Sequence, residues 1–256
     1  MLSLHIVYRH NPSFLFCVQK NTIKEINMTS QWRMSKEDSK YFPSVVRGMT
    51  VKQELITRIQ VVCMIFTVGC RLHLPIYAIG TASTLFHRFY ARAAFHDWHP
   101  KHIALACLFI ASKSDEAARR ASDVAKFWMW HPDYPVDRAK ADEVSECILY
   151  YELVVCEETC FDLQIDLPYY DLFQFTAELN TPVDITYSAY TFINDSFRLP
   201  MTLWYEPRQI AAGALYLSYV QMRKDEKFHY DDSTRFGALL IRDVEIIKGL
   251  YIVYNL

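Results

Sequence analysis

Residues 99–116, HPKHIALACLFIASKSDE, decide the fold. Between Ile103 and Ala111 the stretch is almost entirely apolar, and its apolar side chains cover more than one face of the helix that the pattern predicts. A helix that is apolar all round belongs at the centre of a helical bundle. Pro100 suits the first turn, where a missing backbone N–H leaves no hydrogen bond unmade. The abrupt charged end at Lys113 needs a separate explanation.

The same pattern occurs a second time further along the chain. Pro207 lies 107 residues after Pro100, and pairing the two aligns HPKHIALACLFIAS with YEPRQIAAGALYLS. The same displacement aligns TLF at 84–86 with TFI at 191–193. Two separated matches in one register indicate a duplicated helical unit. A unit of this length holds about five helices with short connections.

The sequence therefore predicts an all-α protein built from two tandem five-helix bundles. We expect an N-terminal extension with a lead-in helix at 1–44, a first bundle at 45–163 and a second bundle at 164–256. The two bundles are joined through FDLQIDLPYY, residues 161–170, where Pro168 prevents one continuous helix. Helical organisation begins only after Met28, which gives the hypothesis that translation starts there.

Composition narrows the classes of function. The 256 residues are 52% hydrophobic, which supports a large core, and the net charge of −2 disfavours nucleic acid or a membrane surface as the main partner. Only six glycines occur, so a glycine-rich phosphate loop is disfavoured. The run VVCMIFTVGC, residues 61–70, is shorter than the roughly 20 residues that cross a bilayer, so we expect no transmembrane helix. Most of the seven cysteines lie in apolar helical patterns, which is typical of reduced core residues.

Several stretches resemble one family. HPKHIALACLFIASKSDE resembles the third helix of the cyclin box, and ILYYELVVCEETCFDL, residues 148–163, resembles its fifth. Residues 31–60, QWRMSKEDSKYFPSVVRGMTVKQELITRIQ, together with LFHRFYAR at 85–92 and FINDSFRLPMTLWYEPRQIAAGALYLS at 192–218, resemble the transcription cyclins, the group of cyclins K, L, T and C. The resemblance covers about residues 31–256. The compact length is most similar to fungal cyclin subunits of kinases that act on the RNA polymerase II C-terminal repeat domain.

The resemblance implies a kinase-binding face where the third helix ends and the fifth begins. Lys113 matches the lysine that donates to backbone carbonyls near the C helix of the kinase, and Glu152 matches the glutamate that accepts from backbone groups there. Further residues of the implied face are Asp115 and Glu116 beside the pair and, around it, Ser114, Cys156, Phe161 and Leu163. The charged end of the third helix is then an interface anchor.

The implied function is that of a regulatory subunit and not of an enzyme. Binding of such a subunit moves the C helix of a cyclin-dependent kinase inward, so that the Lys–Glu ion pair that positions ATP is assembled. The resemblance implies a heterodimer with the kinase, leaves a third subunit open, implies a nuclear location and requires no cofactor. The sequence itself contains no recognisable set of nucleophile, base and orienting group.

One departure from the cell-cycle cyclins lies in ITRIQVVCM, residues 56–64, which keeps Arg58 but has Met64 where those cyclins have tryptophan. We expect Arg58 to be a buried structural donor, with His87 as a neighbour. Pro100 and Pro207 are expected to be structural as well.

Alternatives to the kinase-binding interpretation remain. Lys113 alone could be a solvated lysine favoured by the helix dipole. A general transcription factor of the B type, which binds DNA and a saddle-shaped partner, has the same fold, as has a helical scaffold without a kinase. The acidic balance, the absence of a zinc ribbon and the Lys113–Glu152 pair argue against the first of these.

A metal site is the last alternative. His96, His99 and His102 are spaced three apart, but His99 precedes Pro100, so the three do not share one helical face. Cys156 and Cys160 lack C-x-x-C spacing, and we expect no metal at either place.

Overall fold

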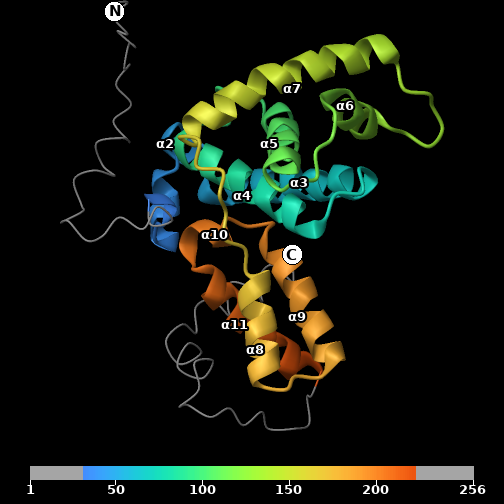
Figure 1. The fold of residues 1–256 in the computed structure, drawn as a ribbon. Helices are drawn as coiled ribbons and strands as arrows, with labels where there is room; N and C mark the ends of the chain where they lie inside the picture. Colours follow the sequence, from blue (N-terminus) through green and yellow to red (C-terminus); the bar gives the residue numbers. More distant parts are fainter. Residues whose placement is uncertain (1–30, 223–256) are drawn as a thin grey trace, which may run out of the picture.

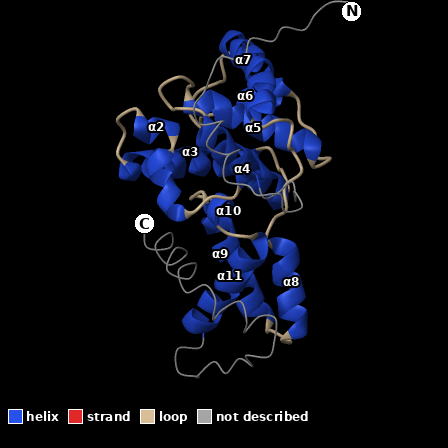
Figure 2. Ribbon diagram, turned by 90° about the vertical axis from the view of Figure 1, so that its left-hand side faces the viewer, coloured by secondary structure: helices blue, strands red, loops and turns tan. Residues whose placement is uncertain are grey.

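The computed structural model describes residues 31–222, and all regular elements within this range are helical (Figures 1 and 2). The prediction of an all-α protein is confirmed. The Met28 hypothesis and the part of the second predicted bundle beyond residue 222 lie outside the described residues.

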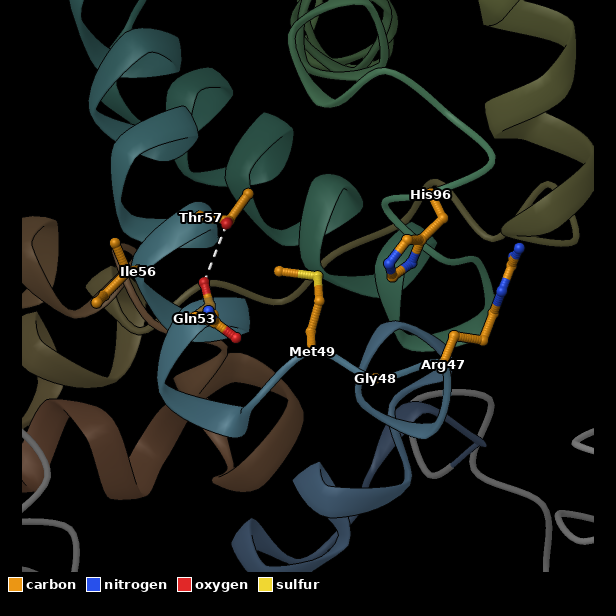
Figure 3. A pocket seen from close by; sticks show the side chains of 7 residues that line it. All are labelled: Arg47, Gly48, Met49, Gln53, Ile56, Thr57 and His96. Atoms are coloured by element: carbon orange, nitrogen blue, oxygen red, sulfur yellow. Dashed lines mark hydrogen bonds between the residues drawn. The ribbon is translucent and has the colours of Figure 1, made fainter.

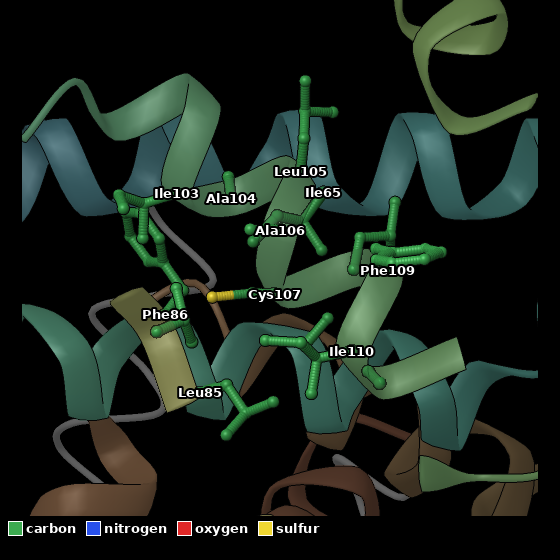
Figure 4. Close-up of a cluster of buried hydrophobic side chains, with 14 of the residues drawn as sticks. Ile65, Leu85, Phe86, Ile103, Ala104, Leu105, Ala106, Cys107, Phe109 and Ile110 are labelled. Atoms are coloured by element: carbon green, nitrogen blue, oxygen red, sulfur yellow. The ribbon is translucent and has the colours of Figure 1, made fainter. Parts of the chain in front are cut away.

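The first bundle has the five helices that the duplicated unit predicts. They are α3 (Val51–Arg71), α4 (Ile76–Arg92), α5 (Pro100–Ser114), α6 (Ala121–Met129) and α7 (Arg138–Glu158). Helix α5 packs against the other four, and every residue from Ile103 to Ser112 is buried. Its side chains pack against Ile65 of α3 and against Leu85 and Phe86 of α4 (Figure 4). The helix that is apolar all round therefore lies at the centre of its bundle.

The second bundle lies below the first in Figure 1. Its described helices are α8 (Tyr169–Glu178), α9 (Val183–Ser196), α10 (Met201–Trp204) and α11 (Pro207–Met222). Helix α11 packs against α8, α9 and α10, as α5 packs against its neighbours. Each bundle thus has a Pro-led helix inside its own core.

The helices keep the register predicted from the sequence. Helices α9 and α11 begin 107 residues after α4 and α5, and α8 ends 107 residues after α3. Each of the first helices, α3 and α8, closes with a residue of positive φ, His73 at 52° and Asn180 at 47°. One position later, Leu74 N donates to Gly69 O and Thr181 N to Thr176 O, at 3.0 and 2.9 Å. The duplication therefore extends to individual backbone hydrogen bonds.

The lead-in is not one helix. It consists of the 3-10 helix η2 (Lys36–Tyr41) and the single turn α2 (Pro43–Val46). Ser35 and Asp38 cap η2 reciprocally, each side chain accepting from the backbone N–H of the other. Trp32 and Phe42 are buried in the core of the second bundle, although they precede the first bundle in sequence.

The connection between the bundles begins well before Pro168. Cys160 and Phe161 both have φ of 54°, a conformation that ends α7. Pro168 is the N-cap residue of α8. The helical path is therefore broken twice, by the two residues after α7 and by the proline.

Helix α3 has the length and apolar composition of a membrane-spanning helix, and within residues 31–222 it alone meets that test. The sequence interpretation considered only 61–70 and so used too short a segment. The packing accounts for the apolar composition, because Val62 and Ile65 lie in the first core and the ionic side chains of Glu54 and Arg58 are fully buried. These contacts are those of a core helix in a bundle.

The six described cysteines are all free, but few are core residues. Cys107 and Cys156 are buried, whereas Cys63, Cys70 and Cys160 are exposed. The interpretation of the cysteines as mostly buried is therefore wrong, because an apolar helical pattern does not tell which of its faces is covered.

Candidate functional site

The structure brings Lys113 and Glu152 together as an ion pair. Lys113 lies in the last turn of α5, and Glu152 lies in the second half of α7 and not near its start. The side chains are 42% and 21% exposed, and the lysine ammonium lies 4.2 Å from the centroid of the Phe109 ring. An ammonium has three donors and a carboxylate has two acceptor oxygens, so each group keeps capacity for a partner.

The four residues predicted around the pair differ in exposure. Phe161 is 66% exposed and offers its ring to solvent, and Ser114 is exposed with its hydroxyl donating to Ala111 O at 3.3 Å. Cys156 is buried, which raises the pKa of its thiol, and Leu163 is half-buried against the first core. Phe161 is thus the one residue of these four that presents a large apolar surface.

Sequence reasoning missed part of this surface. Leu149, Tyr150 and Leu153 of α7 are 49%, 60% and 63% exposed. Leu149 and Leu153 are one helical turn apart, while Ile148 and Val155 face the core. The signal was present in ILYYELVV, which has more apolar residues than one helical face can bury. Helix α7 therefore carries a second, exposed apolar stripe beside Glu152.

Asp115 is directed elsewhere. It is the C-cap residue of α5, and its side chain lines a hollow between the two bundles, where it is hydrogen-bonded to Thr81. Burial raises the pKa of the Asp115 carboxyl. Glu116 is exposed and has φ of 55°. The charged end of α5 thus divides between two surfaces.

Arg58 is fully buried and donates to three acceptors. Its Nε bonds Glu54 Oε1 at 2.6 Å, its Nη1 bonds His87 O at 3.1 Å and its Nη2 bonds Tyr90 O at 2.9 Å. The guanidinium also lies 4.5 Å from the centroid of the Phe42 ring. Arg58 therefore connects α3 and α4 with the lead-in.

His87 completes this buried network. Its Nδ1 lies 3.2 Å from Arg58 Nη1, and its Nε2 lies 2.9 Å from Phe197 O. Because an arginine can only donate, Nδ1 accepts, and Nε2 carries the proton and donates to Phe197 O. Burial, with the neighbouring Arg58 charge, lowers the pKa of His87 to about 3.

Pro100 and Pro207 are the first residues of α5 and α11. Both helices therefore begin with a residue that has no N–H to satisfy.

Residues 27–163 match the family described as the cyclin N-terminal domain. The chain belongs to the cyclin family. This cyclin is 35% identical to cyclin pch1 of Schizosaccharomyces pombe over 193 residues, which is 73% of this chain and 56% of that protein. It is 30% identical to human cyclin-K over 192 residues, 73% of this chain and 33% of that protein. The resemblance to transcription cyclins is confirmed, and the cyclin spans about half of one relative and a third of the other.

Solved structures share the fold of this cyclin. A chain of the yeast RNA Pol II CTD kinase CTDK-1 complex superposes with a TM-score of 0.70 at 14% identity, covering 87% of this chain and 72% of that chain. A chain of the Chaetomium thermophilum CAK complex bound to ATP-gamma-S gives 0.67 at 18%, covering 86% and 76%. A chain of the yeast TFIIK (Kin28/Ccl1/Tfb3) complex gives 0.61 at 18%, covering 88% and 95%. The cyclin-box architecture of the two bundles is thereby supported.

The histidines and cysteines considered as metal ligands make other contacts in this cyclin. The rings of His99 and His102 lie 4.7 Å apart, and Cys160 Sγ accepts from Arg92 Nη1 at 2.8 Å. Among residues 31–222, no group of three His, Cys, Asp or Glu side chains is placed to hold an ion.

A shallow hollow of about 530 Å³ lies beside the first turns of α3 (Figure 3). Its lining includes Arg47, Gln53, Thr57 and His96. Arg47 is paired with Asp97, and the Thr57 hydroxyl donates to Gln53 O at 2.9 Å, as Figure 3 shows. Since two of its polar side chains already have partners, this hollow is a weaker candidate than the Lys113–Glu152 surface.

Proposed function

We propose that this cyclin binds and allosterically activates a cyclin-dependent protein kinase, one that phosphorylates the C-terminal repeat domain of RNA polymerase II. The observation that carries the proposal is the Lys113–Glu152 pair, held at the surface where α5 and α7 meet. The likeness to a chain of an RNA Pol II CTD kinase complex and to transcription cyclins supports the choice of kinase.

The pair has the chemistry to bind helix and loop ends of a partner. Such ends present backbone carbonyls and N–H groups without intrahelical partners, which Lys113 and Glu152 can satisfy respectively. Each hydrogen bond to a charged group contributes about 1.5–3 kcal/mol where water is excluded. Leu149, Leu153 and Phe161 supply exposed apolar surface that can exclude that water.

The role of the cyclin is then positional and not catalytic. By binding the inward position of the kinase C helix more tightly than the outward one, it shifts the kinase towards the state with its ATP-positioning ion pair assembled. We propose a nuclear location in keeping with its transcription-cyclin relatives. A third subunit is part of the proposal, by analogy with the three proteins named in the TFIIK complex.

The test is affinity capture with the full chain as bait, followed by an assay of the eluate on a peptide of the polymerase repeat. We expect Lys113→Ala with Glu152→Ala to lower the recovered kinase activity at least tenfold. The fold should persist by circular dichroism, because an ion pair at the surface contributes only about 0–1 kcal/mol.

The matched control is Asp123→Ala with Lys126→Ala, which removes an exposed ion pair on α6. The control should recover the activity of the wild type. Full activity in the Lys113/Glu152 variant would remove the anchor but keep the activator, whereas no kinase with the wild type would contradict the proposed function and favour a scaffold.

A further inference from the structure

A second candidate site lies between the bundles, away from the Lys113–Glu152 pair. It is a hollow of about 670 Å³. Its walls come from α4, α8, α10 and α11, from the end of the connection between the bundles, and from Trp32 and Arg33 of the lead-in. It is therefore formed only when both bundles and the lead-in are in place.

One wall is a polar stripe on an otherwise buried helix. Tyr77, Thr81, Thr84 and Arg88 of α4 follow each other at intervals of four, three and four residues, which places them on one face. Thr84 is 2% exposed and Arg88 is 5% exposed. Polar groups at this depth are destabilising unless they are hydrogen-bonded.

Several of these groups have no partner in the described part of the chain. The unpartnered buried atoms that line the hollow are Arg33 Nη1, Thr84 Oγ1, Arg88 Nε, Asp115 Oδ2, Thr202 Oγ1 and Arg208 Nη2. Arg88 is nevertheless fixed in place, because its Nη1 donates to Asp162 O at 2.9 Å and lies 3.5 Å from Asp162 Oδ2. The free Nε thus belongs to a preorganised guanidinium group.

The mixture of atoms indicates the class of ligand. The arginine nitrogens require acceptors, whereas Asp115 Oδ2 when ionised accepts a donor. A simple anion would leave Asp115 unsatisfied. It would also meet a charge balance that is close to neutral, since the lining has Arg33, Arg88 and Arg208 against Asp115, Asp166, Asp171 and Glu206. An extended peptide offers carbonyl acceptors and N–H donors side by side.

We propose that this hollow binds a short extended segment of a partner protein, with a backbone carbonyl or side-chain carboxylate of the segment bonded to Arg88 and Thr84 and an N–H of the segment bonded to Asp115. The proposal does not depend on the kinase-binding function, because the two surfaces use different side chains.

The probe is a phage-displayed library of random twelve-residue peptides, selected on the full-length cyclin. The enriched peptides are synthesised with a fluorescent label, and their dissociation constants are measured by fluorescence anisotropy. We expect Thr84→Val to weaken binding about fivefold, as loss of one hydrogen bond does, and Thr84→Val with Asp115→Asn to weaken it at least about twentyfold.

Stability separates this role from a structural one. Thr84→Val removes a hydroxyl without a partner, so the melting temperature should stay the same or rise while binding weakens. The matched control is Ser83→Ala on the same helix, where the lost hydroxyl donates to Ile79 O at 2.8 Å. The control should lower the melting temperature and leave peptide affinity unchanged.

Three results would overturn the proposal. They are failure of any peptide to enrich, equal affinity of the peptides for the wild type and the Thr84/Asp115 variant, and displacement of the peptide by inorganic phosphate, which would mark an anion site. Peptide affinity should be unchanged in the Lys113/Glu152 variant, and a loss there would place the peptide on the other surface and contradict the proposal.

Discussion

Arg58 is the most constrained single residue in the described chain, with no exposed surface and a donated hydrogen bond from each of its three nitrogens. Burying a charge is costly unless it is paired and fully hydrogen-bonded, and Glu54, one turn away, supplies the opposite charge. His87 extends the network to Phe197 O, which belongs to the second core. A buried polar network of this kind couples the two bundles through residues far apart in sequence.

The network predicts an acid-sensitive step in stability. The pKa of His87 is about 3 in the folded chain and about 6.5 when unfolded, so between these values the unfolded state binds more protons. Stability contributed by neutral His87 is therefore complete above pH 6.5 and is lost as the pH falls, by about 1.4 kcal/mol for each pH unit. Urea unfolding at pH 7 and pH 5 should show a loss about 2 kcal/mol larger for the wild type than for His87→Gln. Equal losses in the two proteins would show that His87 titrates normally in the fold.

The duplicated turn is the informative feature at the scale of elements. The α3–α4 and α8–α9 connections have the same closing hydrogen bonds, yet one has His73 and the other Asn180 at the position of positive φ. Asparagine tolerates this conformation better than histidine does, because its short polar side chain can bond locally. The same backbone is therefore more strained in the first bundle.

Glycine substitutions should separate the two turns. We expect His73→Gly to raise the free energy of unfolding by up to about 1 kcal/mol, because glycine has no Cβ to resist positive φ. Asn180→Gly should change it by only a few tenths of a kcal/mol. Urea denaturation of the two variants measures the difference, and a larger gain at Asn180 would contradict the assignment of strain.

The lead-in holds the whole molecule together. The Trp32 ring is buried in the second core, its Nε1 donates to Asp162 Oδ2 at 2.8 Å, and the Arg88 and Arg92 guanidinium groups of α4 lie 5.2 and 4.2 Å from the ring centroid. One side chain thus contacts both bundles and their connection. It also forms part of the proposed peptide site.

Substitutions at Trp32 should affect both the stability and the inter-bundle hollow. Trp32→Ala should lower the free energy of unfolding by about 3–5 kcal/mol, because it removes a large buried side chain. Trp32→Phe keeps most of the ring and loses the bond to Asp162, so a loss of about 1–3 kcal/mol is expected. Denaturant unfolding checks the order, and equal effects of the two substitutions would assign the whole contribution to the hydrogen bond.

Much of the fold could be predicted because its signals are local or periodic. The Pro-led apolar stretches, the displacement of 107 residues and the burial of Arg58 follow from spacing and residue type. The candidate surface was only partly predictable. The pairing of Lys113 with Glu152 came from the resemblance, whereas the direction of Asp115 and the exposure of Leu149 and Leu153 depend on how helices pack.

The sequence by itself determined the helical class, the tandem repeat and the positions of its Pro-led helices, because helix formation and amphipathic periodicity are properties of neighbouring residues. Only the tertiary structure decided that Trp32 belongs to the second core, that His87 reaches Phe197, and that the charged end of α5 divides between an exposed ion pair and a hollow between the bundles. These are contacts between distant parts of the chain, and they are set by the packing of whole helices, which no short stretch of sequence specifies.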